Sequence, residues 1–293
     1  MKIAFSDFWP GWDNRKNFLV SIFSDLGISF EIVDEGADVL IASCFGFSWK
    51  EKEAGKRIYW TGENWYRVDD CLPELDGKRI IDCFDMVYSF DYNEHGNHYR
   101  APLYMLDCVV KGITDFSAVI RRKTKAQLRS EFPGRKFCTF VQGNDLSPYR
   151  NEYFRRLGEI EVVDSFGPVF NNTGVIVDRA GKIEKTRGYK FAMAFENSAY
   201  AGYVTEKLID ALVSDVLPIY WGGSRVGEEF NDKAFVDVGR LGVEPSLALV
   251  RELDKDFELY WQHYDQPIVS GEQLALSERI ASFHRSLRQC VGG

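Results

Sequence analysis

The chain has 293 residues, of which 45% are hydrophobic and 27% charged, a composition typical of a globular protein large enough for two domains. Its formal net charge of −8 argues against a broad nucleic-acid-binding surface, which needs clustered lysine and arginine side chains. A small anionic ligand is still compatible with this charge, because a few convergent cations are enough to bind it.

The cysteines and the N-terminus indicate the compartment. The six cysteines are scattered without a C-x-x-C pair, which favours reduced thiols over a disulfide framework. An acid, Asp7, stands where a signal peptide would carry its apolar stretch. No apolar run approaches the ~20 residues of a membrane span. We therefore expect a cytoplasmic protein without a transmembrane segment, at most peripheral at the inner face of the cytoplasmic membrane.

The first part of the chain alternates short apolar runs with a segment of helical periodicity. Apolar side chains recur at helical spacing over residues 18–26, and Gly27 ends that pattern. Strands are expected at residues 2–8, 28–34, 38–44, 57–61 and 86–90. This rhythm predicts a parallel sheet that is covered by helices.

A second alternating series follows a charged segment of helical pattern at residues 114–131. Strands are expected at 136–141, 189–195 and 216–220, helices at 150–157 and 204–214, and a helical tail from about residue 244. The chain is thus predicted to be an α/β protein with two Rossmann-like domains that face a cleft. The boundaries are 1–115 for the N-terminal domain and 116–293 for the C-terminal domain with its helical tail. Ligands would bind at the carboxyl ends of the strands.

The segment 189–223 carries the clearest chemical pattern. A buried strand ends in Glu196 and Asn197, a loop with Tyr203 follows, and a helix then opens with Glu206 and Lys207. A strand, a small-residue loop and a helix N-terminus form an anion site, because free N–H groups and the helix dipole face the ligand. Lys207 is unfavourable in this first turn unless an anion compensates it. From physics alone, ordinary helix-end charges explain the pattern equally well.

The same segment closely resembles the signature of the α1,3/4-fucosyltransferases, glycosyltransferase family 10. The matching strings are YKF at 189–191, FENS at 195–198, YVTEK at 203–207 and PIYWG at 218–222. Further matches lie upstream, at RNEYF 150–154, TGEN 61–64 and DFWPG 7–11. The resemblance therefore runs from residue 7 to about residue 235, which is most of the chain.

This resemblance implies a glycosyltransferase of the GT-B-like fold that uses GDP-fucose. The expected enzyme is an inverting α1,3-fucosyltransferase, which moves L-fucose from GDP-β-L-fucose to the GlcNAc of an N-acetyllactosamine-type acceptor. The product would be of Lewis x type, on a lipopolysaccharide O-antigen. The first domain would bind the acceptor and the second domain GDP-fucose. Open alternatives are α1,4 or dual specificity, another nucleotide sugar, and a non-catalytic nucleotide-sugar-binding protein.

Roles for the donor-site residues follow from the resemblance. Arg150 and Lys207 would hold the diphosphate, arginine as a fork and lysine as a point charge. Asn197 and Tyr203 would contact the nucleotide portion or the diphosphate. Glu206 would bind fucose hydroxyls.

Glu63 is the predicted general base, because it directly follows a strand and matches the position of the family's proposed base. Without the resemblance, it would be read as a turn acid exposed to water. Trp65 and Tyr66 flank it and are expected to form an acceptor platform. Trp60 is expected to be part of the core.

No metal site and no obligatory cofactor are predicted. His95 and His98 lack the spacing of a helical zinc motif, and Asp254 and Asp256 are expected on a solvated helical face. Stimulation by Mn²⁺ or Mg²⁺ stays open, because a cation can assist a diphosphate leaving group. Glycoside hydrolysis would need two facing carboxylates, and it has no use for an anion site.

Overall fold

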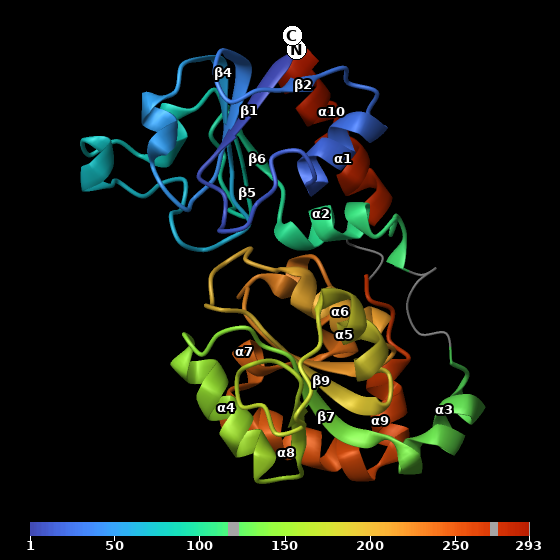
Figure 1. Cartoon of the computed structure of the whole chain (residues 1–293). Coiled ribbons are helices and arrows are strands. Elements are labelled where there is room, and N and C mark those ends of the chain that lie inside the picture. Colours follow the sequence, from blue (N-terminus) through green and yellow to red (C-terminus); the bar gives the residue numbers. More distant parts are fainter. Residues whose placement is uncertain (117–122, 270–274, 293) are drawn as a thin grey trace. The chain divides into compact units, whose positions relative to one another are not determined.

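The computed structural model describes residues 1–116, 123–269 and 275–292 (Figure 1). The chain divides into two compact units, one formed by Met1–Thr114 with Leu276–Gly293 and the other by Asp115–Ala275. Each unit contains its own parallel sheet, as the α/β prediction requires. No helix in the described ranges is both long and apolar enough to cross a membrane.

The first unit is built on a six-stranded sheet in the order β2-β1-β3-β4-β5-β6, and all neighbouring strands are parallel. The predicted strands of this region are confirmed, and a short edge strand, β6, is added. A three-residue edge strand carries too little periodicity to be seen in the sequence. The strands are β1 (Lys2–Ser6), β2 (Glu31–Ile32), β3 (Ala37–Ala42), β4 (Ala54–Trp60), β5 (Met86–Ser89) and β6 (His98–Arg100).

The helices of the first unit come from both ends of the chain. The predicted helix at 18–26 is confirmed as α1, which begins after Asn17, whose side chain accepts a hydrogen bond from the Val20 N–H at 3.0 Å. The helices are α1 (Phe18–Asp25), α2 (Leu103–Val110) and α10 (Leu276–Gly292), with short 3-10 helices at Ser48–Glu51, Pro73–Leu75 and Ile80–Cys83.

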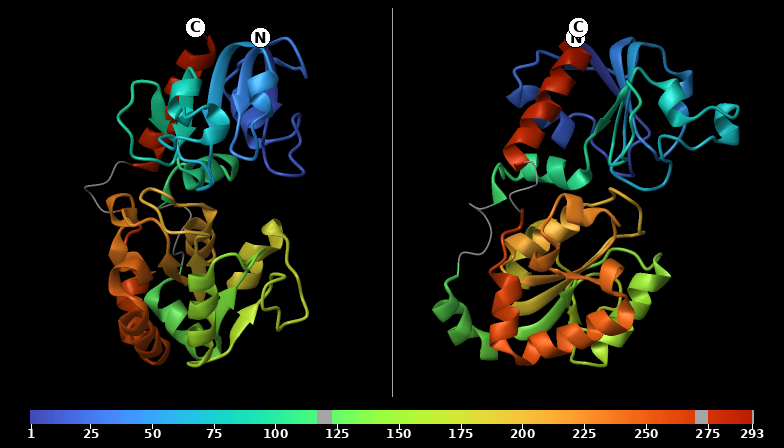
Figure 2. Two further views of the ribbon diagram at one scale, coloured as in Figure 1. Left: turned by 90° about the vertical axis from the view of Figure 1, so that its left-hand side faces the viewer. Right: turned by 180° about the vertical axis from the view of Figure 1, so that it is seen from behind.

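The placement of α10 corrects the predicted domain division, which put the whole tail in the second domain. Tyr88 Oη and Ser286 Oγ are 3.2 Å apart, and Lys56 Nζ donates to the carbonyl oxygen of Cys290 at 2.6 Å. Figures 1 and 2 show α10 beside α1 and α2, with the two chain ends close together. An amphipathic pattern predicts that one face of a helix is buried, but not which sheet buries it.

The second unit is built on a five-stranded parallel sheet in the order β11-β10-β9-β7-β8. Its centre is β9, which pairs with both β7 and β10 and is almost entirely buried. Strands buried on both faces read as continuous apolar runs, which is why β9 stands out in the sequence. The strands are β7 (Lys136–Phe140), β8 (Val163–Ser165), β9 (Tyr189–Phe195), β10 (Leu217–Trp221) and β11 (Val236–Asp237).

Helices cover both faces of this sheet. In Figure 1, α5 and α6 lie above it and α4 and α8 below it, and α8 and α9 contribute Val250, Leu253 and Tyr260 to the core. The predicted helix at 114–131 lies partly outside the described residues. The helices are α3 (Lys125–Glu131), α4 (Pro148–Gly158), α5 (Arg179–Thr186), α6 (Glu206–Val213), α7 (Val238–Leu241), α8 (Val243–Lys255) and α9 (Phe257–Tyr264).

Candidate active site

The carboxyl end of β9 and the start of α6 are joined by the side chain of Glu196. This side chain is fully buried, and Oε1 accepts a hydrogen bond from the Thr205 N–H at 2.7 Å. Its second oxygen, Oε2, accepts from Thr205 Oγ1, also at 2.7 Å. Burial raises the pKa of Glu196, which the nearby Lys207 opposes. Glu196 thus acts as an internal cap for the N-terminus of α6.

Lys207 lies in the first turn of α6 and contacts two carboxylates. Its Nζ is 3.1 Å from Oε2 of Glu196 and 3.5 Å from Oε1 of Glu206. The anion that compensates Lys207 is therefore supplied by the chain itself. The unusual position of this lysine no longer requires a bound phosphate as its explanation. Its side chain is still 15% exposed.

Arg150, on α4, is fully buried beside the same strand end. Its guanidinium donates to Asn197 Oδ1 at 2.8 Å, to the Glu196 carbonyl at 3.4 Å and to the Asn144 carbonyl at 2.8 Å. Its Nε is buried and has no hydrogen-bond partner among the described residues. Burial lowers the pKa of the guanidinium to about 10. The direct hydrogen-bond acceptors of this cation are neutral oxygens, and the Glu196 carboxylate favours its charge without a hydrogen bond to it. Burial costs such a cation solvation, which an anionic ligand nearby would partly offset.

Asn197 and Tyr203 lie against this arginine. Asn197 Oδ1 also accepts from Gln142 Nε2 at 3.4 Å, so its amide oxygen is oriented by two donors. The Tyr203 phenol is buried and close enough to interact electrostatically with Arg150. The structure therefore brings together all five residues predicted for the donor site, with Glu196 linking the arginine to the lysine.

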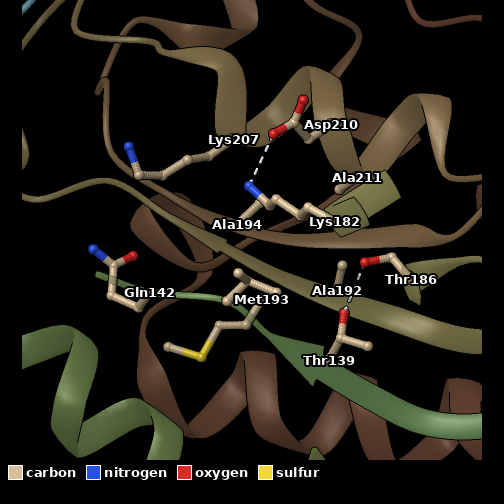
Figure 3. A pocket seen from close by; sticks show the side chains of 11 residues that line it. Thr139, Gln142, Lys182, Thr186, Ala192, Met193, Ala194, Lys207, Asp210 and Ala211 are labelled. Atoms are coloured by element: carbon tan, nitrogen blue, oxygen red, sulfur yellow. Dashed lines mark hydrogen bonds and ion pairs between the residues drawn. The ribbon is translucent and has the colours of Figure 1, made fainter. Parts of the chain in front are cut away.

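A small pocket on the upper face of the sheet opens beside this cluster (Figure 3). The side chains of Lys207 and Gln142 line one end of it. The other wall holds an ion pair between Lys182 Nζ and Asp210 Oδ2 at 2.9 Å, with Asp210 almost fully buried. Lys182 is thus paired with Asp210, whereas the ammonium end of Lys207 points away from that ion pair.

In the first unit, Glu63 follows β4 at the carboxyl edge of the sheet, as predicted, and is half-buried. Thr61 holds its backbone from both sides, because Thr61 Oγ1 donates to the Glu63 carbonyl at 2.9 Å and accepts from the Glu63 N–H at 3.2 Å. Cys44, at the end of β3, interacts with both Thr61 and Glu63. Burial raises the pKa of the Cys44 thiol to about 11, so it stays protonated.

The two residues predicted for the acceptor platform have different surroundings. Trp65 is 59% exposed and contacts Phe45, with ring centroids 5.3 Å apart. Tyr66 is half-buried, and it packs on Phe47 and against a hydrophobic core cluster. Trp60 is 2% exposed, which confirms its expected place in the core.

Asp254 and His98, two residues considered as possible metal ligands in the sequence, make other polar contacts. Asp254 was expected on a solvated face, but its Oδ1 is 2.8 Å from Lys190 Nζ, and this pair ties α8 to β9. His98 Nε2 is 2.8 Å from Ser89 Oγ, in a network that includes Asp91. Within the described ranges, no group of three or more His, Cys, Asp or Glu side chains could hold a metal ion.

Sequence reasoning missed the roles of Glu196, Gln142 and Thr61. Glu196 belongs to the recognised signature, yet its cap on α6 depends on a turn that returns Thr205 to the strand end. Gln142 lies 55 residues before the asparagine that it orients. Such long-range pairs leave no periodic signal in a single sequence. Thr61 did have a signal, because a threonine two residues before an acid in a turn often bonds its backbone.

Two parallel α/β units, with polar clusters at the carboxyl ends of their strands, are the architecture of the GT-B class of glycosyltransferases, to which the similar solved structures belong. A solved α1,3-fucosyltransferase matches 98% of this chain and 90% of its own, with a TM-score of 0.74 and 25% identity. Its complex with GDP-fucose matches with a TM-score of 0.72. A DNA-modifying β-glucosyltransferase shares the fold at 11% identity and a TM-score of 0.56.

Family models identify the chain more narrowly. Residues 3–107 match the alpha-(1,3)-fucosyltransferase FucT N-terminal domain, and residues 134–267 match the glycosyltransferase family 10 (fucosyltransferase) C-terminal domain. The chain belongs to glycosyltransferase family 10, as its motifs indicated.

Two curated relatives show how far the similarity extends. Alpha-(1,3)-fucosyltransferase FucT of Helicobacter pylori is 30% identical over 271 residues, which are 81% of this chain and 54% of that protein. Human GDP-fucose protein O-fucosyltransferase 3 is 30% identical over 222 residues, 70% of this chain and 45% of that protein. The chain thus spans about half the length of these relatives.

Proposed function

We propose that the protein is an inverting α1,3-fucosyltransferase that moves L-fucose from GDP-β-L-fucose to the GlcNAc of an N-acetyllactosamine-type acceptor. The observation that carries this proposal is the buried Arg150, whose charge is held by neutral amide and carbonyl oxygens. A diphosphate bound beside Asn197 would bring negative charge close to this guanidinium. The GDP-fucose complex of the similar α1,3-fucosyltransferase supports the choice of donor.

A single in-line displacement inverts the configuration at the anomeric carbon. The reaction therefore needs only one general base, which removes the proton of the acceptor hydroxyl. Glu63 takes the proton of the acceptor hydroxyl, whose oxygen attacks C1 of fucose. The bond from C1 to the phosphate oxygen breaks, and GDP leaves with the electron pair. Arg150 and Lys207 stabilise the charge that develops on the diphosphate.

The other donor residues bind rather than react. Because Arg150 and Gln142 hold Asn197 Oδ1, its amide nitrogen is left to donate to the nucleotide or its phosphates. Arg150 itself is fully buried, so it acts on the diphosphate through space and through Asn197, whose amide oxygen it holds. Tyr203 fixes the position of Arg150, and Glu206, with 23% of its side chain exposed, accepts hydrogen bonds from fucose hydroxyls.

The acceptor defines the second candidate function. An Arabidopsis thaliana alpha-(1,4)-fucosyltransferase is 39% identical over 77 residues, and the O-fucosyltransferase relatives are named for protein acceptors. Specificity for α1,4 linkage, or for both linkages, is therefore the alternative. We further propose a Lewis x-type product on lipopolysaccharide O-antigen, made in the cytoplasm without an obligatory metal.

The test is GDP release from GDP-fucose, with and without N-acetyllactosamine, for the wild type and for Glu63→Ala. We expect release that depends on the acceptor and falls by about 10²–10⁴-fold in Glu63→Ala, because a positioned base contributes that much. Glu74→Ala is the control, since Glu74 is an exposed acid of the same unit. NMR assignment of the product linkage separates α1,3 from α1,4.

Other outcomes would contradict separate parts of the proposal. GDP binding without any sugar transfer would point to a nucleotide-sugar-binding protein. Full activity in Glu63→Ala would leave the reaction in place but exclude Glu63 as the base. Loss of activity in EDTA, restored by Mn²⁺, would show that a metal is required.

A further inference from the structure

Three aromatic residues lie at the carboxyl edge of the first sheet, each in a loop that leaves a different strand. Trp9 follows β1, Phe45 follows β3 and Trp65 follows β4. These strands are neighbours in the sheet, so their loops meet at one edge. The ring centroids of Trp9 and Phe45 are 6.4 Å apart, and those of Phe45 and Trp65 are 5.3 Å apart. We call these three rings the aromatic shelf.

The shelf is exposed to solvent and supported from behind. Trp65 is 59% exposed, and Trp9 and Phe45 are partly exposed. Trp9 packs on Trp12, at 4.6 Å, and contacts the buried ring of Trp60, at 6.3 Å. Exposed aromatic rings that touch one another mark binding surfaces more often than isolated ones do. The Trp9 end of the shelf is therefore held in place by neighbouring rings before any ligand arrives.

One end of the shelf adjoins the proposed base. Trp65 is in the same loop as Glu63, two residues further along the chain. Phe45 directly follows Cys44, whose thiol interacts with the Glu63 carboxylate. Trp65 is the ring of the shelf nearest to Glu63 in sequence, so we assign it to the sugar whose hydroxyl reaches Glu63. Beyond it, the shelf continues over Phe45 to Trp9, in steps comparable to the width of a sugar ring.

We infer that Phe45 and Trp9 bind a second sugar of the acceptor, by which we mean the sugar joined to the reducing end of the GlcNAc that receives fucose, which N-acetyllactosamine alone lacks. A pyranose ring has an apolar face of C–H groups that stacks on an aromatic ring, while its hydroxyls stay in water. Flat, half-exposed rings favour such a ligand over an extended peptide, whose affinity comes mainly from main-chain hydrogen bonds. The inference rests on the proposed transfer to a glycan, and it makes the preferred acceptor longer than a disaccharide.

The experiment compares kcat/KM for N-acetyllactosamine with that for a tetrasaccharide in which N-acetyllactosamine extends lactose. For the wild type we expect the tetrasaccharide to be preferred about tenfold, the effect of one good ring contact. In Phe45→Ala this preference should fall to near one. Trp65→Ala, in contrast, should lower kcat/KM for both acceptors, because it removes the contact to the first sugar.

Two milder variants separate stacking from packing. Phe45→Tyr keeps a flat ring and should keep the preference, whereas Phe45→Leu keeps an apolar side chain without the ring and should lose it. Thermal unfolding shows whether each variant is folded. Saturation-transfer NMR with the tetrasaccharide should detect contact with the second sugar in the wild type and in Phe45→Tyr, but not in Phe45→Leu.

Several results would overturn the inference. Equal use of both acceptors by the wild type, or an unchanged preference in Phe45→Leu, would show that the shelf binds no second sugar while the proposed function stands. Transfer to a peptide but to neither glycan would overturn the inference and the glycan acceptor together. Donor turnover without transfer to any acceptor would refute the proposed function itself.

Discussion

Glu63 illustrates how a single residue is positioned by its neighbours. Thr61 bonds both backbone groups of Glu63, and Gly62 between them is closely packed against its neighbours. A Cβ at Gly62 would lie 3.1 Å from the Trp60 ring and 3.2 Å from Leu103. The turn is thus fixed on two sides, which limits where the carboxylate can point. The glutamate and its place after a strand were visible in the sequence. The arrangement of Thr61 and Gly62 that holds it, which we call the Thr61 clamp, depends on packing against Leu103 of α2.

Thr61→Val should slow catalysis without weakening donor binding. Valine has the shape of threonine but lacks the hydroxyl, so two hydrogen bonds of about 0.5–1.5 kcal/mol each are lost and the Glu63 N–H loses its partner. We expect a kcat about tenfold lower, with an unchanged KM for GDP-fucose. Steady-state kinetics over a range of pH would measure this.

Thr61→Ser keeps the hydroxyl and serves as the control for this prediction. It should retain most of the activity. If serine were as damaging as valine, the methyl group rather than the hydroxyl would matter, and the clamp would be refuted.

At the scale of elements, the junction between β9 and α6 holds the donor site together. Glu196 directly follows β9, and its side chain caps α6. Gly222, which directly follows β10, lies close to that side chain. A Cβ at Gly222 would lie 2.4 Å from Cγ of Glu196 and 2.6 Å from the Tyr220 hydroxyl. Two strands, β9 and β10, and the helix between them, α6, therefore meet at the side chain of Glu196. The glycine of the PIYWG string is required by this close approach, not by an unusual backbone angle.

Gly222→Ala should destabilise the second unit and weaken GDP binding at the same time. The added methyl group must displace Glu196 or Tyr220, and overpacking of this kind costs about 1–3 kcal/mol. A displaced Glu196 would move both Thr205 and Lys207. Denaturant unfolding and calorimetric titration with GDP measure the two effects.

Gly188→Ala is a matched control, because a Cβ at Gly188 has no atom within 4 Å. This variant should change stability by less than about 0.5 kcal/mol and leave GDP affinity as it is. Equal behaviour of the two variants would mean that Gly222 is not a packing requirement.

At the scale of the whole molecule, the chain returns to its first unit after completing the second. Phe283 of α10 is 1% exposed, and its ring lies 5.6 Å from Tyr88 and 6.2 Å from Tyr99. The core of the first unit is therefore complete only when the last helix is present. Both ends of the chain belong to that unit, whereas the second unit is continuous in sequence.

Phe283→Ala should destabilise the first unit and leave the second unaffected. Loss of a buried aromatic ring costs about 3–5 kcal/mol, so hydrogen exchange should rise in residues 1–114 but not in 123–269. Val110→Ala, at an exposed position of α2, is the control and should change exchange little. Faster exchange throughout the second unit as well would show that the two units unfold together.

Most of the architecture could be predicted because it follows from local patterns of apolar residues along the sequence. Buried parallel strands such as β9 appear as apolar runs, α1 and α6 appear as helical periodicity, and both domain series follow from their alternation. Apart from Arg150 on α4, the donor residues could be named because the signature places them at the end of β9, in the loop that follows and at the start of α6. Their proximity follows from that connection alone.

What the sequence determined by itself is the α/β class, the family, and the residues that gather at each sheet edge. The tertiary structure decided three further matters: that Lys207 is compensated by Glu196, that Arg150 is buried among neutral amides, and that α10 completes the first unit. Each of these depends on contacts between residues far apart in the chain. Periodicity and motifs describe the local chain, whereas charge compensation and burial are settled only when distant segments pack together.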